Sequence, residues 1–119
     1  MGSALTRYFA RPEQEYDLFR QFETKLMEQG LVHYASWLLD RGLRDQDELE
    51  QALFKAVQAV CAARVSCREH FKRIYVCQHG QLKTDWLVSD LGMRMIIMHA
   101  DPRNPAMASL QVQILSASH

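Results

Sequence analysis

The sequence lacks a long apolar run. The longest candidate, residues 93–100, is interrupted by Arg94 and His99, whereas crossing a bilayer takes roughly 20 consecutive apolar residues. The N-terminus also lacks the basic stretch followed by an apolar stretch that marks a secretory signal. We therefore expect no membrane partner and no secretory signal.

Cysteine is scarce, and neither sign of charge is in excess. Three cysteines, Cys61, Cys67 and Cys77, leave an odd thiol under any pairing, which is more typical of a reducing cytoplasm than of a secreted disulfide scaffold. The 14 Lys and Arg residues balance the 14 Asp and Glu residues. A free-standing nucleic-acid binder is usually basic, so this balance argues against strong non-specific DNA binding but is compatible with a local basic face. We expect a cytoplasmic protein.

Hydrophobic residues, in contrast, make up 48% of the chain. A chain of 119 residues can bury one core but not two. No repeat, linker or biased segment divides the sequence. The prediction is therefore one domain over residues 1–119, with residues 1–12 as a flexible N-terminal segment.

The region before residue 35 fits two structures. Leu18, Phe22 and Leu26 have the spacing of one face of a helix over residues 13–28. Alternate residues from Phe22 onward also fit a strand, which would give a short helix followed by a hairpin over residues 21–34. Periodicity alone does not distinguish the two.

A short helix over residues 36–41 and a long helix over residues 47–64 are expected next. The long helix carries two apolar stripes at helical spacing. The first stripe consists of Leu49, Ala52, Leu53, Ala56, Ala59, Val60 and Ala63, and the second of Phe54, Val57 and Cys61. Two stripes exceed what one core of this size needs, and an exposed stripe is a liability in a monomer. We therefore expect a homodimer with the second stripe as its interface.

Two strands, over residues 72–76 and 82–88, are predicted on either side of a turn at residues 78–81. Gly80 stands in this turn where a positive φ would be needed. Helix, turn, helix and hairpin follow one another in the order of a winged helix-turn-helix.

Two capped helices are expected to end the chain, over residues 90–99 and 104–115. Ser89 or Asp90 can cap the first, and Asn104 followed by Pro105 is a start signal for the second. The predicted fold class is therefore α+β, with a winged-helix-turn-helix-like centre, a small antiparallel hairpin and two C-terminal helices.

A set of residues keeps a characteristic order and spacing through most of the chain. It consists of Tyr34-Ala35, Leu38, Leu49, Ala52-Leu53, Ala56, Ala59, His70-Phe71, Asp85-Trp86, Val88-Ser89, Asp101-Pro102, Pro105, Ala108 and Gln111. This set resembles the N-terminal module of the DNA-damage-inducible protein D family and the Bro-N domains of phage antirepressor-like proteins. The resemblance favours the hairpin over residues 21–34. It also implies a DNA-binding or regulatory module of the damage or phage response rather than an enzyme.

Basic residues gather around the start of the predicted hairpin. The candidate nucleic-acid-binding residues are Arg64, Arg68, Lys72, Arg73, Lys83 and Lys55. Guanidinium and ammonium groups can hold phosphate oxygens, and the simpler alternative is a solvated helix end and strand start. Asp47 and Glu48 stand at the N-terminus of the would-be recognition helix, where base contacts are normally made, and they repel phosphate.

Two other kinds of site have weaker patterns. Cys67, His70, Cys77 and His79 could close a zinc site, but the favoured interpretation is a packed histidine, two half-buried free thiols and an exposed turn histidine. Ser89 or Cys77 could act as a nucleophile only with a base and an oxyanion donor pair in reach, and the sequence specifies neither. We expect no metal, no cofactor and no catalytic residues.

The expected function is thus a non-enzymatic, DNA-associated regulatory domain in a damage or phage response. The alternative is a protein-interaction or dimerisation module that keeps the fold without binding DNA. The basic residues and the resemblance favour the first, whereas the neutral charge and the acidic helix start favour the second.

Overall fold

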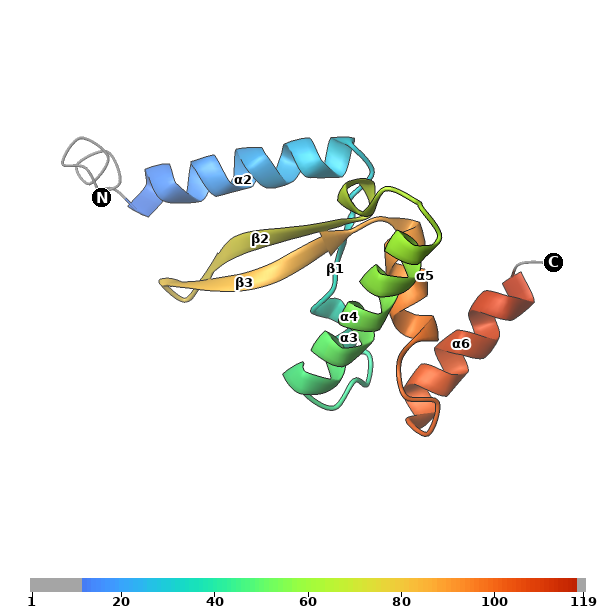
Figure 1. Cartoon of the computed structure of the whole chain (residues 1–119). Helices are drawn as coiled ribbons and strands as arrows, with labels where there is room; N and C mark the ends of the chain where they lie inside the picture. Colours follow the sequence, from blue (N-terminus) through green and yellow to red (C-terminus); the bar gives the residue numbers. More distant parts are fainter. Residues whose placement is uncertain (1–11, 118–119) are drawn as a thin grey trace.

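The protein is an α+β domain, described here by a computed structural model over residues 12–117 (Figure 1). The predicted flexible segment 1–12 lies outside the described residues, apart from Pro12, which begins the first helix described. The elements are α2 (Pro12–Glu28), β1 (His33–Tyr34), α3 (Trp37–Asp40), α4 (Gln46–Ala62), the 3-10 turn η1 (Cys67–Glu69), β2 (Phe71–Gln78), β3 (Gln81–Val88), α5 (Asp90–Met98) and α6 (Pro105–Ala117). The strands form one antiparallel sheet in the order β1-β3-β2.

The N-terminal region is a single helix, so the hairpin favoured over residues 21–34 is wrong. α2 ends in a Schellman motif, in which the Leu31 N–H donates to the Leu26 carbonyl at 3.0 Å. Both leucines are buried against Ile74 and Leu87 of the sheet. The strand-like alternation of apolar residues from Phe22 onward was misleading, because this segment is a helix whose apolar face packs on the sheet. Only β1 is extended, and it pairs with β3.

The short and long helices form as predicted, with small shifts at their ends. Asp45 caps α4 by accepting the Glu48 N–H at 2.9 Å. The first apolar stripe of α4 supplies Leu49, Ala52, Leu53, Ala56 and Val60 to the core. α4 ends in a second Schellman motif, with the Val65 N–H bonded to the Val60 carbonyl at 3.1 Å.

The hairpin of β2 and β3 is longer than expected and is closed by a two-residue turn. His79 and Gly80 have φ values of 53° and 77°, as a type I′ hairpin turn requires. Because side chains alternate along a strand, the hairpin has two faces. The α2 face carries Lys72, Ile74, Val76, Lys83, Asp85 and Leu87, and the α4 face carries Phe71, Arg73, Tyr75, Cys77, Leu82, Thr84, Trp86 and Val88.

α5 and α6 are capped as the sequence indicates. Ser89, rather than Asp90, caps α5 by accepting the Gly92 N–H at 3.0 Å. The Asn104 side-chain oxygen accepts the Ala106 N–H at 3.0 Å at the start of α6, while its Nδ2 donates to the Gly42 carbonyl at 2.8 Å. Asn104 therefore both starts α6 and fixes it to the turn before α4.

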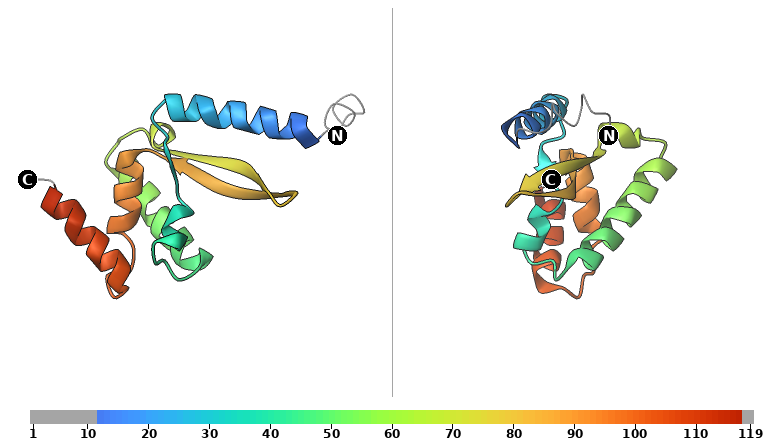
Figure 2. Two further views of the ribbon diagram at one scale, coloured as in Figure 1. Left: turned by 180° about the vertical axis from the view of Figure 1, so that it is seen from behind. Right: turned by 90° about the vertical axis from the view of Figure 1, so that its left-hand side faces the viewer.

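The helices lie on both sides of the sheet. α2 covers one side, and α3, α4 and α5 pack on the other, as the views of Figure 2 show. The main core is formed by Ala35, Leu38, Leu43, Leu49, Ala52, Leu53, Ala56, Val60, Phe71, Val88, Ile96, Ile97, Ala100 and Met107. The distal part of the hairpin projects beyond α3, α4 and α5, and α2 runs alongside it (Figure 1). Among residues 12–117, no helix combines the length and the apolar character needed to span a bilayer.

Candidate functional site

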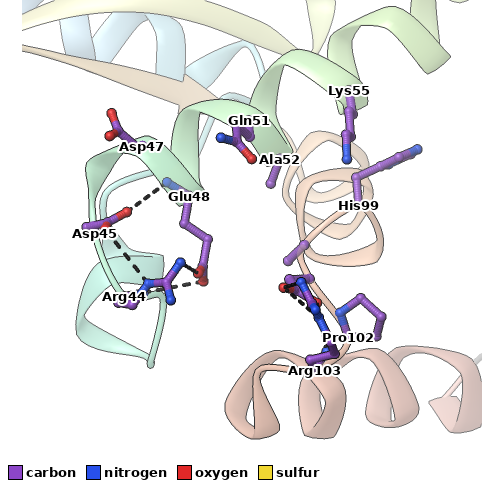
Figure 3. A pocket seen from close by; sticks show the side chains of 12 residues that line it. Arg44, Asp45, Asp47, Glu48, Gln51, Ala52, Lys55, His99, Pro102 and Arg103 are labelled. Atoms are coloured by element: carbon purple, nitrogen blue, oxygen red, sulfur yellow. Dashed lines mark hydrogen bonds and ion pairs between the residues drawn. The ribbon is translucent and has the colours of Figure 1, made fainter.

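A polar cleft of about 580 Å³ lies between α4 and the connection from α5 to α6 (Figure 3). It is lined by Arg44, Asp45, Asp47, Glu48, Gln51, Ala52, Lys55, His99, Ala100, Asp101, Pro102 and Arg103. Lys55 and His99 lie at one end of the cleft, and the two arginines lie at the other (Figure 3). We call this set the polar cleft.

Most charges of the polar cleft are already paired with one another. Arg44 lies 3.5 Å from a carboxylate oxygen of Glu48 and 3.8 Å from one of Asp45. Arg103 lies 3.0 Å from a carboxylate oxygen of Asp101. Hydrogen bonds from the side chain and the backbone N–H of Arg103 lower the pKa of the Asp101 carboxyl group. With four carboxylates among its lining residues, the cleft offers a poor surface for phosphate.

A different group of basic residues lies on and beside the hairpin. Arg64 and Arg68 belong to the connection between α4 and β2, Lys72 and Arg73 to the first half of β2, and Lys83 to β3. All five side chains are exposed, and none forms an ion pair within residues 12–117. We call these five the hairpin cations. Lys55, which we predicted to act with them, lies in the polar cleft instead.

The strand register divides the hairpin cations between two faces. Lys72 stands opposite Leu87 and Lys83 opposite Val76, so both lie on the α2 face of the hairpin. Arg73 stands opposite Trp86, on the α4 face. The hairpin cations therefore surround the hairpin rather than form one flat patch.

An apolar groove of about 470 Å³ lies between α4 and the α4 face of the hairpin. Its lining consists of Gln46, Leu49, Glu50, Leu53, Phe54, Val57, Arg73, Thr84, Asp85 and Trp86. Phe54, on α4, is 64% exposed. Tyr75 and Leu82, on the α4 face of the hairpin, are 56% and 53% exposed. We call this surface the apolar groove.

The groove contains two of the three predicted interface residues. Phe54 and Val57 line it, but Cys61 does not. Cys61 is joined to Cys67 by a disulfide, with their Cα atoms 6.0 Å apart, and only Cys77 is a free thiol. The expectation of half-buried free thiols is therefore wrong for Cys67, because the turn after α4 brings it back to the helix.

Residues missed by the sequence argument complete the groove. Trp86 lines the groove and Tyr75 extends its exposed face, although neither was assigned to a surface beforehand. Their signal was present in the alternation of the strands. It could be used only once the pairing of β2 with β3 showed which residues share a face with Phe54.

Several residues of the characteristic set hold the fold together. Asp85 accepts the N–H groups of Ser36 at 3.2 Å and of Trp86 at 2.7 Å, and also the Ser36 hydroxyl, which ties β3 to the turn before α3. Tyr34 donates its hydroxyl to Glu23 of α2, and burial together with this bond raises the pKa of the phenol. These contacts give structural reasons for part of the pattern.

The alternative zinc ligands are not brought together. Cys67 is in the disulfide, and His70 Nδ1 lies 2.6 Å from Ser89 Oγ. Within the part of the chain that the structure describes, no three His, Cys, Asp or Glu residues are placed to hold a metal ion.

His70 is also a base within reach of Ser89, which the sequence did not reveal. The Ser89 oxygen is buried and accepts the Gly92 N–H as the cap of α5. Neither residue lines the polar cleft or the apolar groove. The pair therefore joins the start of β2 to the start of α5, and this contact explains its geometry without a substrate.

No protein-family model, curated protein or solved structure matches this chain. The resemblance to the damage-inducible protein D and Bro-N modules thus stays a prediction that depends on the residues quoted for it. Function has to be argued from the surfaces described above.

Proposed function

We propose that this chain is a non-enzymatic, DNA-associated regulatory domain that contacts phosphates through the hairpin cations. The observation that carries this proposal is the contrast in pairing. The hairpin cations have no ion-pair partner among the described residues, whereas Arg44 and Arg103 are neutralised in the polar cleft. Residues 64–88 hold five Lys and Arg against two Asp and Glu, a net charge of +3. Phosphate contacts need such uncompensated charge.

The order of elements supports a winged-helix assignment. β1, α3, α4, β2 and β3 follow one another as strand, helix-turn-helix and hairpin, with β3 between β1 and β2 in the sheet. In this assignment the hairpin is the wing, and α4 is the recognition helix. Two departures are that α2 packs on the sheet and that α5 packs with α4.

We propose that the wing, rather than α4, makes the main DNA contact. The start of α4 carries Asp45, Asp47, Glu48 and Glu50, and residues 40–55 hold five acidic against three basic residues. Carboxylates at the N-terminus of a recognition helix oppose its entry into the major groove, because they meet phosphates there. The proposed binding is therefore salt-dependent and weakly sequence-specific.

The setting of this function is proposed from the sequence. The resemblance suggests a damage or phage response, and the odd number of cysteines suggests the cytoplasm. The disulfide between Cys61 and Cys67 counts against a permanently reducing compartment. Trapping the free thiols in cells tests the location, because a cytoplasmic chain should have this pair largely reduced.

Fluorescence anisotropy over a salt series tests the proposed DNA binding. Replacing Arg68, Lys72 and Lys83 together by Ala should weaken binding at least tenfold at low salt. It should also reduce the slope of log K against log salt by roughly 0.9 for each lost phosphate contact. The matched control replaces Arg44, Lys55 and Arg103 by Ala, which removes the same charge from the polar cleft. Equal losses for the two triple variants would show that only net charge matters, and would contradict the site.

A protein-interaction module without DNA binding is the second candidate. The apolar groove, with Phe54 mostly exposed, is the observation that favours it. The same titration separates the two functions. If the unmodified protein binds neither duplex nor single-stranded DNA at low salt, the interaction module becomes the better account.

A further inference from the structure

We propose that the apolar groove is the contact surface of a two-fold homodimer, in which α4 of each copy packs against the hairpin of the other. This interface differs from the one expected from the sequence, which ran along α4 alone. It does not depend on DNA binding, but it pairs Arg73 and leaves Arg64, Arg68, Lys72 and Lys83 as the hairpin cations open to phosphate. Three properties of the groove support it, namely its apolar exposure, its shape and its charges.

Exposed aromatic and aliphatic side chains occur both on α4 and on the α4 face of the hairpin. Phe54, Tyr75 and Leu82 are each more than half exposed, and Trp86 shares the α4 face of the hairpin with Tyr75 and Leu82. Large aromatic residues are enriched in protein interfaces, and contiguous apolar surface is costly to leave in water. The groove thus has the composition of a surface that becomes covered.

The shape of the groove suits contact with a second copy of itself. Phe54 is mostly exposed in the groove lining, whereas Leu53, Val57 and Trp86 of the same lining are buried or half-buried. In a two-fold contact the same patch of both copies meets, so each patch has to supply both a projection and a recess. Phe54 of one copy can enter the recess of the other, and the reverse follows by symmetry.

The charges of the groove favour a second copy as the partner. Asp85, one of three charged residues in the lining, has its carboxylate bonded to Ser36 and to the Trp86 N–H. Of the other two, Glu50 stands on the α4 wall and Arg73 on the hairpin wall. Neither forms an ion pair within the described residues, and the Glu50 carboxylate accepts only a hydrogen bond from Gln46, at 3.1 Å. Bringing the α4 wall of one copy against the hairpin wall of the other places Glu50 beside Arg73 of the partner copy, twice. The groove is thus complementary in charge to itself.

A second exposed apolar surface, on α6, lacks this property. Val112 and Leu115 are 63% and 57% exposed, but no charged residue occurs in Pro105–Ala117. Nothing on α6 would therefore fix the orientation of a second copy. This comparison favours the groove as the dimer contact and provides an alternative that the experiment can detect.

Light scattering on the whole chain, at a series of protein concentrations, tests the dimer. The unmodified protein should reach twice the mass of one chain. Phe54→Glu should raise the dimer dissociation constant at least about 30-fold while leaving the circular dichroism spectrum unchanged. Gln51→Glu, which adds the same charge at an exposed α4 position that lines the polar cleft and not the groove, should leave the dimer intact.

A mixing experiment tests the predicted charge contact directly. Glu50→Arg and Arg73→Glu should each weaken the dimer about tenfold, because like charges then meet across the interface. Mixed in equal amounts, the two variants should form a heterodimer of nearly normal affinity, since both contacts then join opposite charges. A pair formed within one chain could not produce this recovery.

Three results would overturn the proposal. The first is an unmodified protein that stays monomeric at high micromolar concentration. The second is a mixture of Glu50→Arg and Arg73→Glu that associates no better than either variant alone. The third is a dimer disrupted by Val112→Glu but not by Phe54→Glu, which would place the interface on α6. If Phe54→Glu unfolds the chain, the mixing experiment still decides.

Discussion

The polar cleft and the hairpin both carry basic residues, but they use them differently. In the cleft, Arg44 and Arg103 form ion pairs with Glu48 and Asp101, and these carboxylates offset their positive charge. Around the hairpin, the cations extend into water without a carboxylate partner in the described residues. A count of charges cannot separate the two regions, since the chain as a whole is neutral. What differs is pairing, and pairing determines which surface can attract phosphate.

The largest effect is expected from Gly42→Ala, in the turn between α3 and α4. Gly42 has a φ of +120°, and an added Cβ would lie 2.3 Å from the Cβ of Ala106. Strained backbone and overpacking should together lower the free energy of unfolding by about 3 kcal/mol or more. Urea denaturation measures this change. The phosphate affinity of the folded fraction should be unaltered, because the hairpin cations are untouched.

A compensating substitution serves as the control for Gly42→Ala. Adding Ala106→Gly removes the steric overlap and leaves the cost of the positive φ, so about half of the lost stability should return. A single variant as stable as the unmodified chain would show that Gly42 and Ala106 are not packed this closely.

The next effect concerns the connection that carries Arg64 and Arg68. The disulfide between Cys61 and Cys67 closes a short loop, so its reduction should lower the free energy of unfolding by about 2 kcal/mol. Denaturation with and without a thiol reductant measures the difference. Cys77→Ser should keep this sensitivity, whereas Cys61→Ser should abolish it. An unmodified chain that is insensitive to reductant would contradict the pairing.

Removing the ion-pair partners of the cleft arginines should make the polar cleft resemble the hairpin. Glu48→Gln together with Asp101→Asn removes the charged partners of Arg44 and Arg103. The cleft should then acquire phosphate affinity, with an increase of about two- to fivefold in DNA binding at low salt and a steeper salt dependence. Anisotropy titration measures both quantities. If affinity is unchanged, pairing is not what keeps the cleft from binding phosphate.

The smallest effect is the pH dependence contributed by Asp101. Its pKa is lowered by Arg103, so the folded state binds a proton on this group less readily than the unfolded chain does. The resulting stabilisation is present above the ordinary aspartate pKa of about 3.9 and is lost as the pH falls through the lowered value. Asp101→Asn should therefore remove a small part of the acid sensitivity seen in thermal melts. The pair is exposed to water, so salt should weaken this contribution.

Much of the fold could be predicted because its signals are local. Ser89 and Asn104 cap helices where their side chains suggested it, and the turn around Gly80 closes the hairpin. The failure before residue 35 has a non-local cause. Leu26 is buried through contact with Ile74 and Leu87, which follow it in the sequence by about 50 and about 60 residues. No local sequence pattern predicts a contact between residues so far apart.

The candidate site was less accessible from the sequence than the fold. Hairpin cations such as Arg68 could be named from their spacing, but the pairing of Arg44 could not. Arg73 and Lys72 are neighbours in sequence, yet the register places them on opposite faces of the hairpin. The disulfide was missed because cysteine spacing does not show that a turn brings Cys67 back to Cys61. These properties depend on three-dimensional placement.

The position of β2 at the outer edge of the sheet has a consequence for solubility. An edge strand exposes unpaired backbone N–H and C=O groups, onto which a strand of another molecule can add, and natural proteins discourage this with charged side chains. Lys72 and Arg73 stand side by side on this edge strand, one on each face. They can therefore act as gatekeepers against strand addition, whatever else they bind. Neutralising both would be expected to favour aggregation of the chain during folding and storage, and polyanions that mask them would do the same.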